Sequence, residues 1–444
     1  MKNVCKKWMW LCLLFVSMAN LFTACSTVDA DGETTLSPDP NRIIVHKLFP
    51  NDMARNDSAA ANLARGIKLV VHPKASYKLS FEIDSTQPVP ELQLFRTFAI
   101  KNDPDHVGFS KVRTLQPKVV GNRYEYSFKC EENNMSIWFT SLGVDGKYYE
   151  GKIKDIRFTG VGAFSDHFSI NLIVVGEMEK TLDGMDVEEL SQFMLKKFRE
   201  KYYGVTIDTI YVHYAHEHPT LGYKYPKDRP WVANVDAEDY LLSELAGWVG
   251  NDANVRYALD IVLVHSIDQK NVTGYSPLFS GNLGGGEGGS VIIGENVKQS
   301  SGEIEVQTAL NIVMTAVHES GHFFGLRHTS TTRRDLNQVV ALEDGSSRMV
   351  GDWSNVEDGL TDTPFCDYIL KSGLYKQANN QDDEISRNPN IVYSGKASLS
   401  KSPIYECKDI DNIMFPVTVE EYLDASFTKQ QMELVRSSLV IFPH

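Results

Sequence analysis

Residues 318–328 read HESGHFFGLRH and hold three of the chain's 12 histidines, spaced four and six positions apart. On a helix, His318 and His322 would be one turn apart and would project from the same face. Two imidazoles on a rigid element suit Zn²⁺. Gly325 can adopt the left-handed conformation that ends a helix, which would bring His328 back as a third ligand. Three protein ligands with one open position are typical of catalytic zinc.

Glu319 follows the first of these histidines directly and is the candidate catalytic group. Zinc would lower the pKa of a bound water and polarise a scissile carbonyl, and Glu319 would take the proton and later deliver it to the leaving amine. The alternative is a buried helix with satisfied core histidines, which a lone histidine would favour. Because HExxHxxGxxH specifies five positions together, we expect a zinc centre.

The stretch resembles the active helix of the metzincin metallopeptidases, and most closely that of the pappalysin (cytophagalysin) branch. Three further segments resemble that branch and follow in the family's order: DGLTDTPFC (358–366), CKDIDNIMFP (407–416) and SFTKQQM (426–432). The resemblance covers residues 168–444. It implies a metzincin-type α/β zinc peptidase domain.

The resemblance also assigns roles to residues outside the helix. It implies that Met414 forms the methionine turn beneath the metal and that Cys366 and Cys407 are disulfide-bonded, although Met414 alone could be a core residue. The family usually has tyrosine two positions after this methionine, where this chain has Pro416. Another tyrosine, Tyr393 or Tyr405, would then stabilise the oxyanion, or the oxyanion hole is weaker.

An oxygen-rich segment precedes Cys366 and could hold a structural Ca²⁺. Its candidate ligands are Asp358, Leu360, Asp362 and Thr363. A plain surface loop explains the same residues equally well. A rival metal cluster, YVHYAHEHP with His213, His216, Glu217 and His218, directly follows a strand without helical spacing. We interpret that cluster as a solvated strand end.

The N-terminus has the features of an export signal. Lysines precede a short apolar run in residues 1–24, and the run is too short to span a bilayer comfortably, which disfavours a membrane anchor helix. LFTAC resembles a bacterial lipobox, with Phe22 as a departure, and would make Cys25 the lipidated residue. Residues 25–41 are polar and acidic, as in a flexible tether. Outside these segments three cysteines remain, which suggests one disulfide and one free thiol.

Residues 42–165 have a β pattern. YKLSFEID (77–84) and YEYSFKC (124–130) alternate apolar and polar residues, and MSIWFT (135–140) and KIKDIRFTGV (152–161) continue the pattern. We expect a β-sandwich, jelly-roll-like in its last strands, that either binds carbohydrate or serves as a structural spacer.

Residues 166–444 alternate strand and helix, which indicates an α/β sheet. We expect strands at 168–176, 205–214 and 258–266 and helices at 185–204 and 237–250. A buried helix is expected over 300–325, begun by a capping box of Ser300 and Glu303. Before it, residues 290–293 would form an edge strand that pairs with an extended substrate.

Together these features predict an α+β multidomain protein whose activity is zinc-dependent endopeptidase cleavage of extracytoplasmic proteins or peptides. It would be exported and lipid-anchored to a bacterial membrane, with Zn²⁺ as its catalytic metal and Ca²⁺ as a candidate structural metal. The formal charge of −14 argues against nucleic acid as a partner. The main alternative is a surface protein that binds protein or glycan and carries a vestigial peptidase domain; intact Glu319 argues against decay. The sandwich could also restrain or orient the peptidase.

Overall fold

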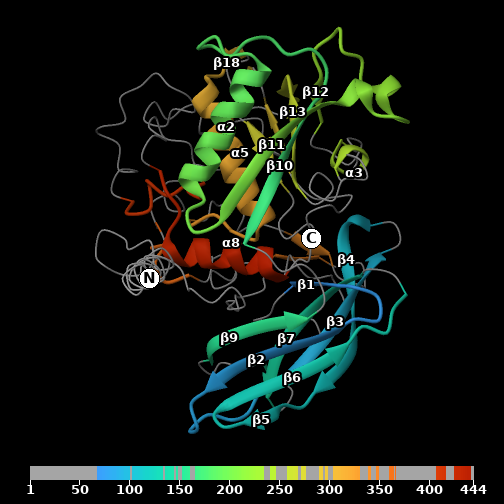
Figure 1. Ribbon diagram of the computed structural model, residues 1–444, viewed down its shortest axis with the longest axis vertical. Coiled ribbons are helices and arrows are strands. Elements are labelled where there is room, and N and C mark those ends of the chain that lie inside the picture. Colours follow the sequence, from blue (N-terminus) through green and yellow to red (C-terminus); the bar gives the residue numbers. More distant parts are fainter. Residues whose placement is uncertain are drawn as a thin grey trace, which may run out of the picture. The chain divides into compact units, whose positions relative to one another are not determined.

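The computed structural model describes residues 68–100, 103–133, 136–144, 147–148, 153–160, 166–234, 241–246, 258–268, 272–276, 290–293, 296–298, 304–330, 339–341, 347–349, 360–364, 366, 407–416 and 425–441. The expected signal segment and tether, including Cys25, lie outside this part of the chain. The described architecture is β-rich, with few helices (Figure 1).

Two antiparallel sheets form the first part of the described chain. Their strands are β1 (Lys68–Val71), β2 (Ser76–Ile83), β3 (Glu91–Ile100), β4 (Asp103–Leu115), β5 (Lys118–Val120), β6 (Arg123–Lys129), β7 (Ser136–Val144), β8 (Lys147–Tyr148) and β9 (Ile153–Gly160). One sheet has the order β1-β7-β3-β4, with β8 on β7, and the other β5-β6-β2-β9. The chain crosses repeatedly between the sheets, as in jelly-roll and Greek-key sandwiches, although the hairpins β3–β4, β5–β6 and β7–β8 each stay within one sheet.

Both sheets contribute to one hydrophobic core, which makes this part a β-sandwich. Alternation along β2 turns Tyr77, Leu79 and Phe81 inward. The rings of Phe128 on β6 and Trp138 on β7 stack across the two sheets, with centroids 6.1 Å apart. Each fully buried side chain of this size contributes roughly 1.5–3 kcal/mol. The strands expected from alternation in the sequence are confirmed.

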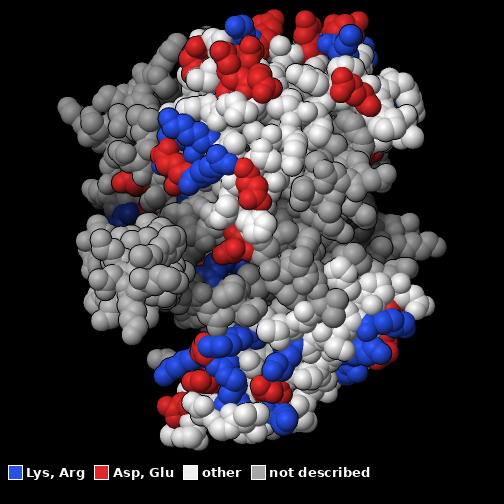
Figure 2. All heavy atoms as spheres, in the orientation of Figure 1, with Lys and Arg blue, Asp and Glu red and all other residues white. Residues whose placement is uncertain are grey.

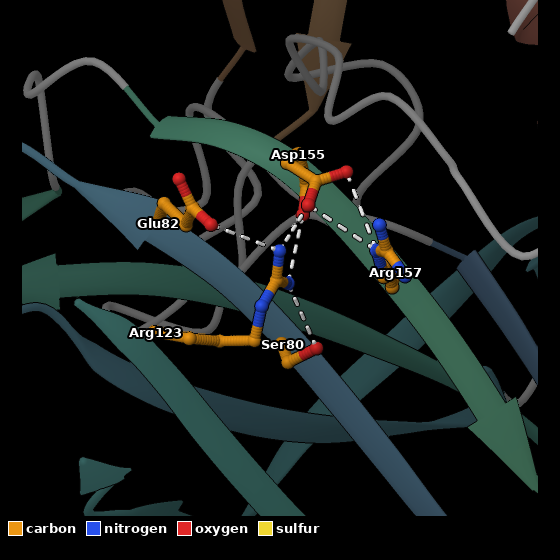
Figure 3. A network of polar contacts seen from close by, with 5 residues as sticks. All are labelled: Ser80, Glu82, Arg123, Asp155 and Arg157. Carbon is orange, nitrogen blue, oxygen red and sulfur yellow. Dashed lines mark hydrogen bonds and ion pairs between the residues drawn. The ribbon is translucent and has the colours of Figure 1, made fainter. Parts of the chain in front are cut away.

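The outward face of the second sheet carries a polar network centred on Arg123 (Figure 3). Its guanidinium donates to the Ser80 hydroxyl at 3.2 Å and to the Asp155 carbonyl at 3.0 Å, and it pairs with the carboxylates of Glu82 and Asp155. The β2–β9 register shifts beside Ser80, and Asp155 has a positive φ of 47°. Arg123 thus secures an irregular stretch of the sheet. Figure 2 shows basic side chains with acidic ones among them on the sandwich face in view.

A separate, mostly parallel sheet follows the sandwich. Its strands are β10 (His167–Val174), β11 (Thr206–Tyr214), β13 (Leu259–Val264), β15 (Gly274–Tyr275) and β16 (Ser290–Ile293), in the order β11-β10-β13-β16-β15. Only β15 runs antiparallel to its neighbour. The expectation that residues 290–293 form the sheet edge is wrong, because β16 pairs with β13 on one side and with β15 on the other.

Two helices pack side by side against this sheet, α2 (Val187–Lys201) and α5 (Ala309–Phe323) (Figure 1). Helix α2 begins with a capping box in which Asp186 and Glu189 satisfy each other's backbone N–H groups. Helix α5 begins later than expected. Residues 304–306 form strand β18, and the Thr308 side chain caps the helix by accepting from the Asn311 N–H at 3.2 Å.

The last described helix is α8 (Lys429–Ile441), which is largely buried. The remaining elements are η3 (Ala215–Glu217), η4 (Gly222–Lys224), β12 (Val232–Ala233), α3 (Leu241–Leu245), β14 (Ser266–Ile267), β17 (Asn296–Lys298), β18 (Ile304–Val306), β19 (Val339–Ala341) and β20 (Ser347–Met349). Within the described ranges, no helix combines the length and apolar character needed to cross a membrane.

Candidate metal centre

Helix α5 carries the first two candidate ligands. Its residues from Ile312 to Val317 are buried, which fixes the helix against the sheet. The hydroxyl of Tyr202, at the end of α2, donates to the carbonyl of Val317 at 2.8 Å, directly before His318. His318 and His322 therefore project from an element held both by the sheet and by α2, as a metal site requires.

A tight turn after α5 returns the chain to these two histidines. Gly325 has a φ of +92°, a conformation that glycine adopts without strain. Its N–H donates to the His322 carbonyl at 2.9 Å, and the Leu326 N–H donates to the Gly321 carbonyl at 2.9 Å. This Schellman-like ending places His328 opposite the helix, as the sequence predicts.

The Nε2 atoms of the three histidines converge. That of His328 lies 3.2 Å from the Nε2 of His318 and 3.2 Å from the Nε2 of His322. The Nδ1 of His318 lies 2.6 Å from the Ile413 carbonyl oxygen, and the Nδ1 of His322 lies 2.8 Å from that of Leu326. A carbonyl can only accept, so both Nδ1 atoms carry the proton, and in the neutral rings both Nε2 atoms present lone pairs.

Three ring nitrogens that converge in this way are better suited to coordinating a cation than to hydrogen-bonding with one another. A proton on the Nε2 of His328 could satisfy one of its two contacts but not both. A tetrahedral ion with Zn–N bonds of about 2.05 Å would separate its nitrogen ligands by roughly 3.3 Å, close to the separations observed. The carbonyls that hold Nδ1 of His318 and His322 are the outer-shell partners that metal-bound histidines usually have.

The environment keeps the three imidazoles neutral. Burial lowers the pKa of His318, against the hydrogen bond to Ile413. Burial, and next the neighbouring His318, lower the pKa of His322 to about 3. Burial and the two neighbouring rings hold the pKa of His328 well below its usual range. A metal would thus meet deprotonated ligands at neutral pH.

Glu319 lies next to His318 and is only 8% exposed. Burial raises the pKa of its carboxyl to about 8. A group that titrates near the working pH can both accept and return a proton. Such a perturbed carboxyl beside a cluster of metal-binding residues is typical of a catalytic site, although burial alone also occurs in structural sites.

Met414 lies against the helix that carries His318 and His322. An ideal Cβ atom built at Gly321 would be 2.6 Å from its sulfur, so the thioether packs where this glycine leaves room. The carbonyl of Ile413, one residue earlier, is the partner of His318. The segment expected to form a methionine turn thus touches the ligand helix by packing and by hydrogen bonding.

Some of the other predicted residues belong to the described part of the chain and some do not. Cys366 and Cys407 form a disulfide with a Cα–Cα distance of 5.3 Å, and Cys130 is a buried free thiol. Pro416 is partly buried. Tyr393 and Tyr405 lie outside the described residues.

The candidate calcium segment contributes to the start of helix α8. One oxygen of Asp362 accepts from the Thr428 hydroxyl and the other from the Gln430 N–H, each at 2.9 Å. These bonds cap the helix. Leu360 is partly buried and Thr363 is buried, while Asp358 lies outside the described residues. These bonds give the segment a structural role, and Ca²⁺ binding there stays a prediction.

The rival histidine cluster is dispersed. His213 lies on β11 with its Nε2 3.2 Å from the Asn171 side-chain oxygen, and His218 accepts from the backbone of Leu221 at 3.1 Å. His216 and Glu217 lie in η3. Among the described residues, the only group of three histidines that could share a metal is that of His318, His322 and His328.

Sequence reasoning missed a buried network beside His328. The Asp409 carboxylate accepts from the Thr329 hydroxyl at 2.5 Å and from the Ser330 hydroxyl at 2.6 Å. The Ser330 oxygen in turn accepts from the Cys366 N–H at 2.8 Å. The signal available in the sequence was a lone aspartate two residues after Cys407, which by itself says nothing about its partner.

Comparison with known proteins leaves the chain without an assigned family: no protein-family description and no curated protein matches it. The solved structures with slight similarity include two that contain carbohydrate-active enzymes. One is the CBM22-1–GH10 portion of Clostridium thermocellum xylanase 10B complexed with xylohexaose, at 13% identity and a TM-score of 0.13, covering 30% of this chain and 29% of that one. The other is a Corynascus thermopiles carbohydrate esterase family 2 enzyme with its carbohydrate-binding domain, at 9% identity and a TM-score of 0.10, covering 50% and 64%. The chain spans less than two thirds of either, and similarity this low carries no argument.

Proposed function

We propose that this protein is a zinc-dependent endopeptidase of the metzincin type. The observation that supports the proposal most is the convergence of three lone-pair nitrogens, those of His318, His322 and His328, beside the buried Glu319. Zinc held by three imidazoles would supply an acidified water and a polarised carbonyl.

The chain's own residues do the rest of the work. Glu319 takes the proton of the attacking water and passes it to the leaving amine, for which a pKa near neutrality is suited. The carbonyls of Ile413 and Leu326 orient the imidazoles of His318 and His322. Met414 supports the ligand helix from below at Gly321.

The substrate would pair with the edge of the mixed sheet. Among the described strands, β15 lies at the end of the sheet next to β16. An extended peptide added to this edge would be held by main-chain hydrogen bonds, largely independently of its sequence. We therefore propose that the substrate peptide pairs with β15 (Gly274–Tyr275) and not with residues 290–293.

The wider assignment remains part of the same proposal. The chain acts outside the cytoplasm, anchored through Cys25 to a bacterial membrane, on extracytoplasmic proteins or peptides. The β-sandwich orients the peptidase domain or binds a glycan or protein. The Arg123 network supports a structural role for one face of the sandwich, since its charged groups satisfy one another.

The test is cleavage of a mixed peptide library by the purified protein, with products identified by mass spectrometry. We expect cleavage that stops on chelation, returns with Zn²⁺, and is lost in Glu319→Gln, which should still bind zinc. Glu131→Gln, an exposed glutamate of the sandwich, is the matched control and should cleave like the wild type. Zinc binding without cleavage of any peptide would support the alternative of a binding protein with a vestigial peptidase domain.

A further inference from the structure

Asp409 occupies an energetically unfavourable position. Its side chain is 4% exposed, and its Oδ1 has no hydrogen-bond partner among the described residues. All its side-chain bonds to other residues pass through Oδ2, from the hydroxyls of Thr329 and Ser330. A buried carboxylate with one unsatisfied oxygen costs stability, so its presence calls for a compensating role.

That role follows from where the two hydroxyls lie. Thr329 and Ser330 directly follow His328, which is the one ligand outside helix α5. The helix fixes His318 and His322, whereas the position of His328 depends on the bonds that hold its own segment. These bonds include the Gly325 turn before it and, after it, the Asp409 bonds and the Thr329 N–H donated to the Met414 carbonyl at 3.0 Å.

The network also connects the site to the disulfide. Cys407 lies two residues before Asp409, and the Cys366 N–H donates to Ser330, so both cysteines flank groups that hold the segment after His328. The hydroxyl-to-carboxylate distances of 2.5 and 2.6 Å are those of charge-assisted bonds, which are about twice as strong as neutral ones.

We propose that Asp409 is a positioning residue for the metal centre: through Thr329 and Ser330 it holds His328 where its Nε2 completes the three-nitrogen site. This inference rests on the proposed zinc function. Asp409 does not touch the metal or the substrate. It sets the affinity and geometry of the site by fixing the single ligand that the helix does not carry.

Zinc affinity and cobalt spectra test the inference independently of peptidase activity. Zn²⁺ affinity of the purified protein is measured by competition with a chromophoric chelator, and the visible spectrum is recorded with Co²⁺ in place of zinc. Asp409→Asn keeps the shape of the side chain but replaces one acceptor oxygen with an NH₂ group. Thr329→Val removes one hydroxyl at constant volume, and Thr329→Ser restores it. Asp411→Asn, an exposed aspartate of the same loop, is the matched control.

We expect Asp409→Asn to weaken zinc binding by about tenfold, as loss of an outer-shell partner does, and to change the cobalt spectrum. Thr329→Val should weaken binding too, while Thr329→Ser and Asp411→Asn should match the wild type. A purely structural role would lower the melting temperature of the metal-free variants without changing affinity or spectrum in the folded protein.

Two results would overturn the inference, and they can be told apart. If the wild type binds zinc and both Asp409→Asn and Thr329→Val bind it within twofold of the wild type, Asp409 does not position His328. If Asp409→Asn does not fold, Thr329→Val alone decides the question. If the wild type itself does not bind zinc, the proposed function fails, and the inference fails with it.

Discussion

The sulfur of Met414 occupies the space that a side chain at Gly321 would need, since a Cβ atom there would lie 2.6 Å from it. Gly321 precedes the candidate ligand His322 on α5 and follows Glu319 by two residues. Glycine in a helix interior normally costs about 1 kcal/mol relative to alanine. Here that cost allows the methionine to approach the backbone of the ligand helix.

The first prediction concerns this contact. Gly321→Ala should destabilise the protein despite its higher helix propensity, because overpacking costs about 1–3 kcal/mol, and it should weaken zinc binding by displacing His322 or Met414. Thermal unfolding and chelator competition measure both effects. The double variant Gly321→Ala/Met414→Ala should recover part of the loss, because the smaller side chain vacates the space. Additive effects of the two substitutions would show that the contact does not matter.

The second prediction is a pH effect on the metal-free protein. Burial raises the pKa of Glu319 to about 8, above its value in the unfolded chain. Its contribution to stability is therefore fully present below the unfolded pKa and is lost as pH rises through about 8. The three histidines have lowered pKa values, so their contribution is present above the unfolded histidine pKa and is lost on acidification. Above about pH 6.5, the ionisation of Glu319 should therefore determine how the stability contributed by these four residues changes with pH.

Glu319→Gln should remove that loss, so the metal-free variant should be more stable than the metal-free wild type at pH 8–9. Chemical denaturation at pH 6.5 and pH 9 in the presence of a chelator measures the difference. Glu131→Gln, on the exposed surface of the sandwich, should follow the wild type at both pH values. Equal pH dependence in wild type and Glu319→Gln would mean that the glutamate is not desolvated in the metal-free protein.

The third prediction is that metal removal destabilises the chain. A ligand that binds only the native state stabilises it by about 4 kcal/mol when its concentration is a thousandfold above Kd. Chelation should therefore lower the melting temperature, and added Zn²⁺ should restore it. His322→Ala lacks one of the three nitrogens and should melt at nearly the same temperature with and without chelator. An identical response of wild type and variant to chelation would count against the site.

The local parts of the site were predictable, because they depend on residues close in sequence. The shared face of His318 and His322 follows from their four-residue spacing on a helix, and the positive φ of Gly325 follows from the preference for glycine where a helix ends. The groups that hold the ligands were not predictable in this way. The Ile413 carbonyl is 95 residues from His318, and Asp409 is 80 residues from Thr329. No periodicity indicates a partner at such a distance.

The fold was predictable to a similar degree. Apolar alternation located β2 and β6, and continuous apolar runs located β10 and β13, because burial on one or both faces determines these patterns. The errors involve pairing and boundaries. The sequence predicts an edge strand at residues 290–293 because nothing local reveals that the two-residue strand β15 covers β16. It predicts a helix that already includes residues 304–306 because a short apolar strand before a helix does not interrupt the apolar pattern.

The last prediction concerns the sandwich. The Arg123 side chain is 18% exposed, and its removal would take away the cation that Glu82 and Asp155 share, although Asp155 would keep its pair with Arg157 at 3.2 Å. Arg123→Met should therefore cost about 2 kcal/mol of unfolding free energy.

Asp155→Asn should cost less than Asp155→Ala, because asparagine tolerates the positive φ of that position. Lys78→Met is the matched control: its single pair with Glu125, at 3.3 Å on the same sheet, is 44% exposed on the lysine side and should contribute little. Chemical denaturation of the four variants gives the comparison, and a loss for Lys78→Met equal to that for Arg123→Met would show that the network adds nothing beyond one surface ion pair.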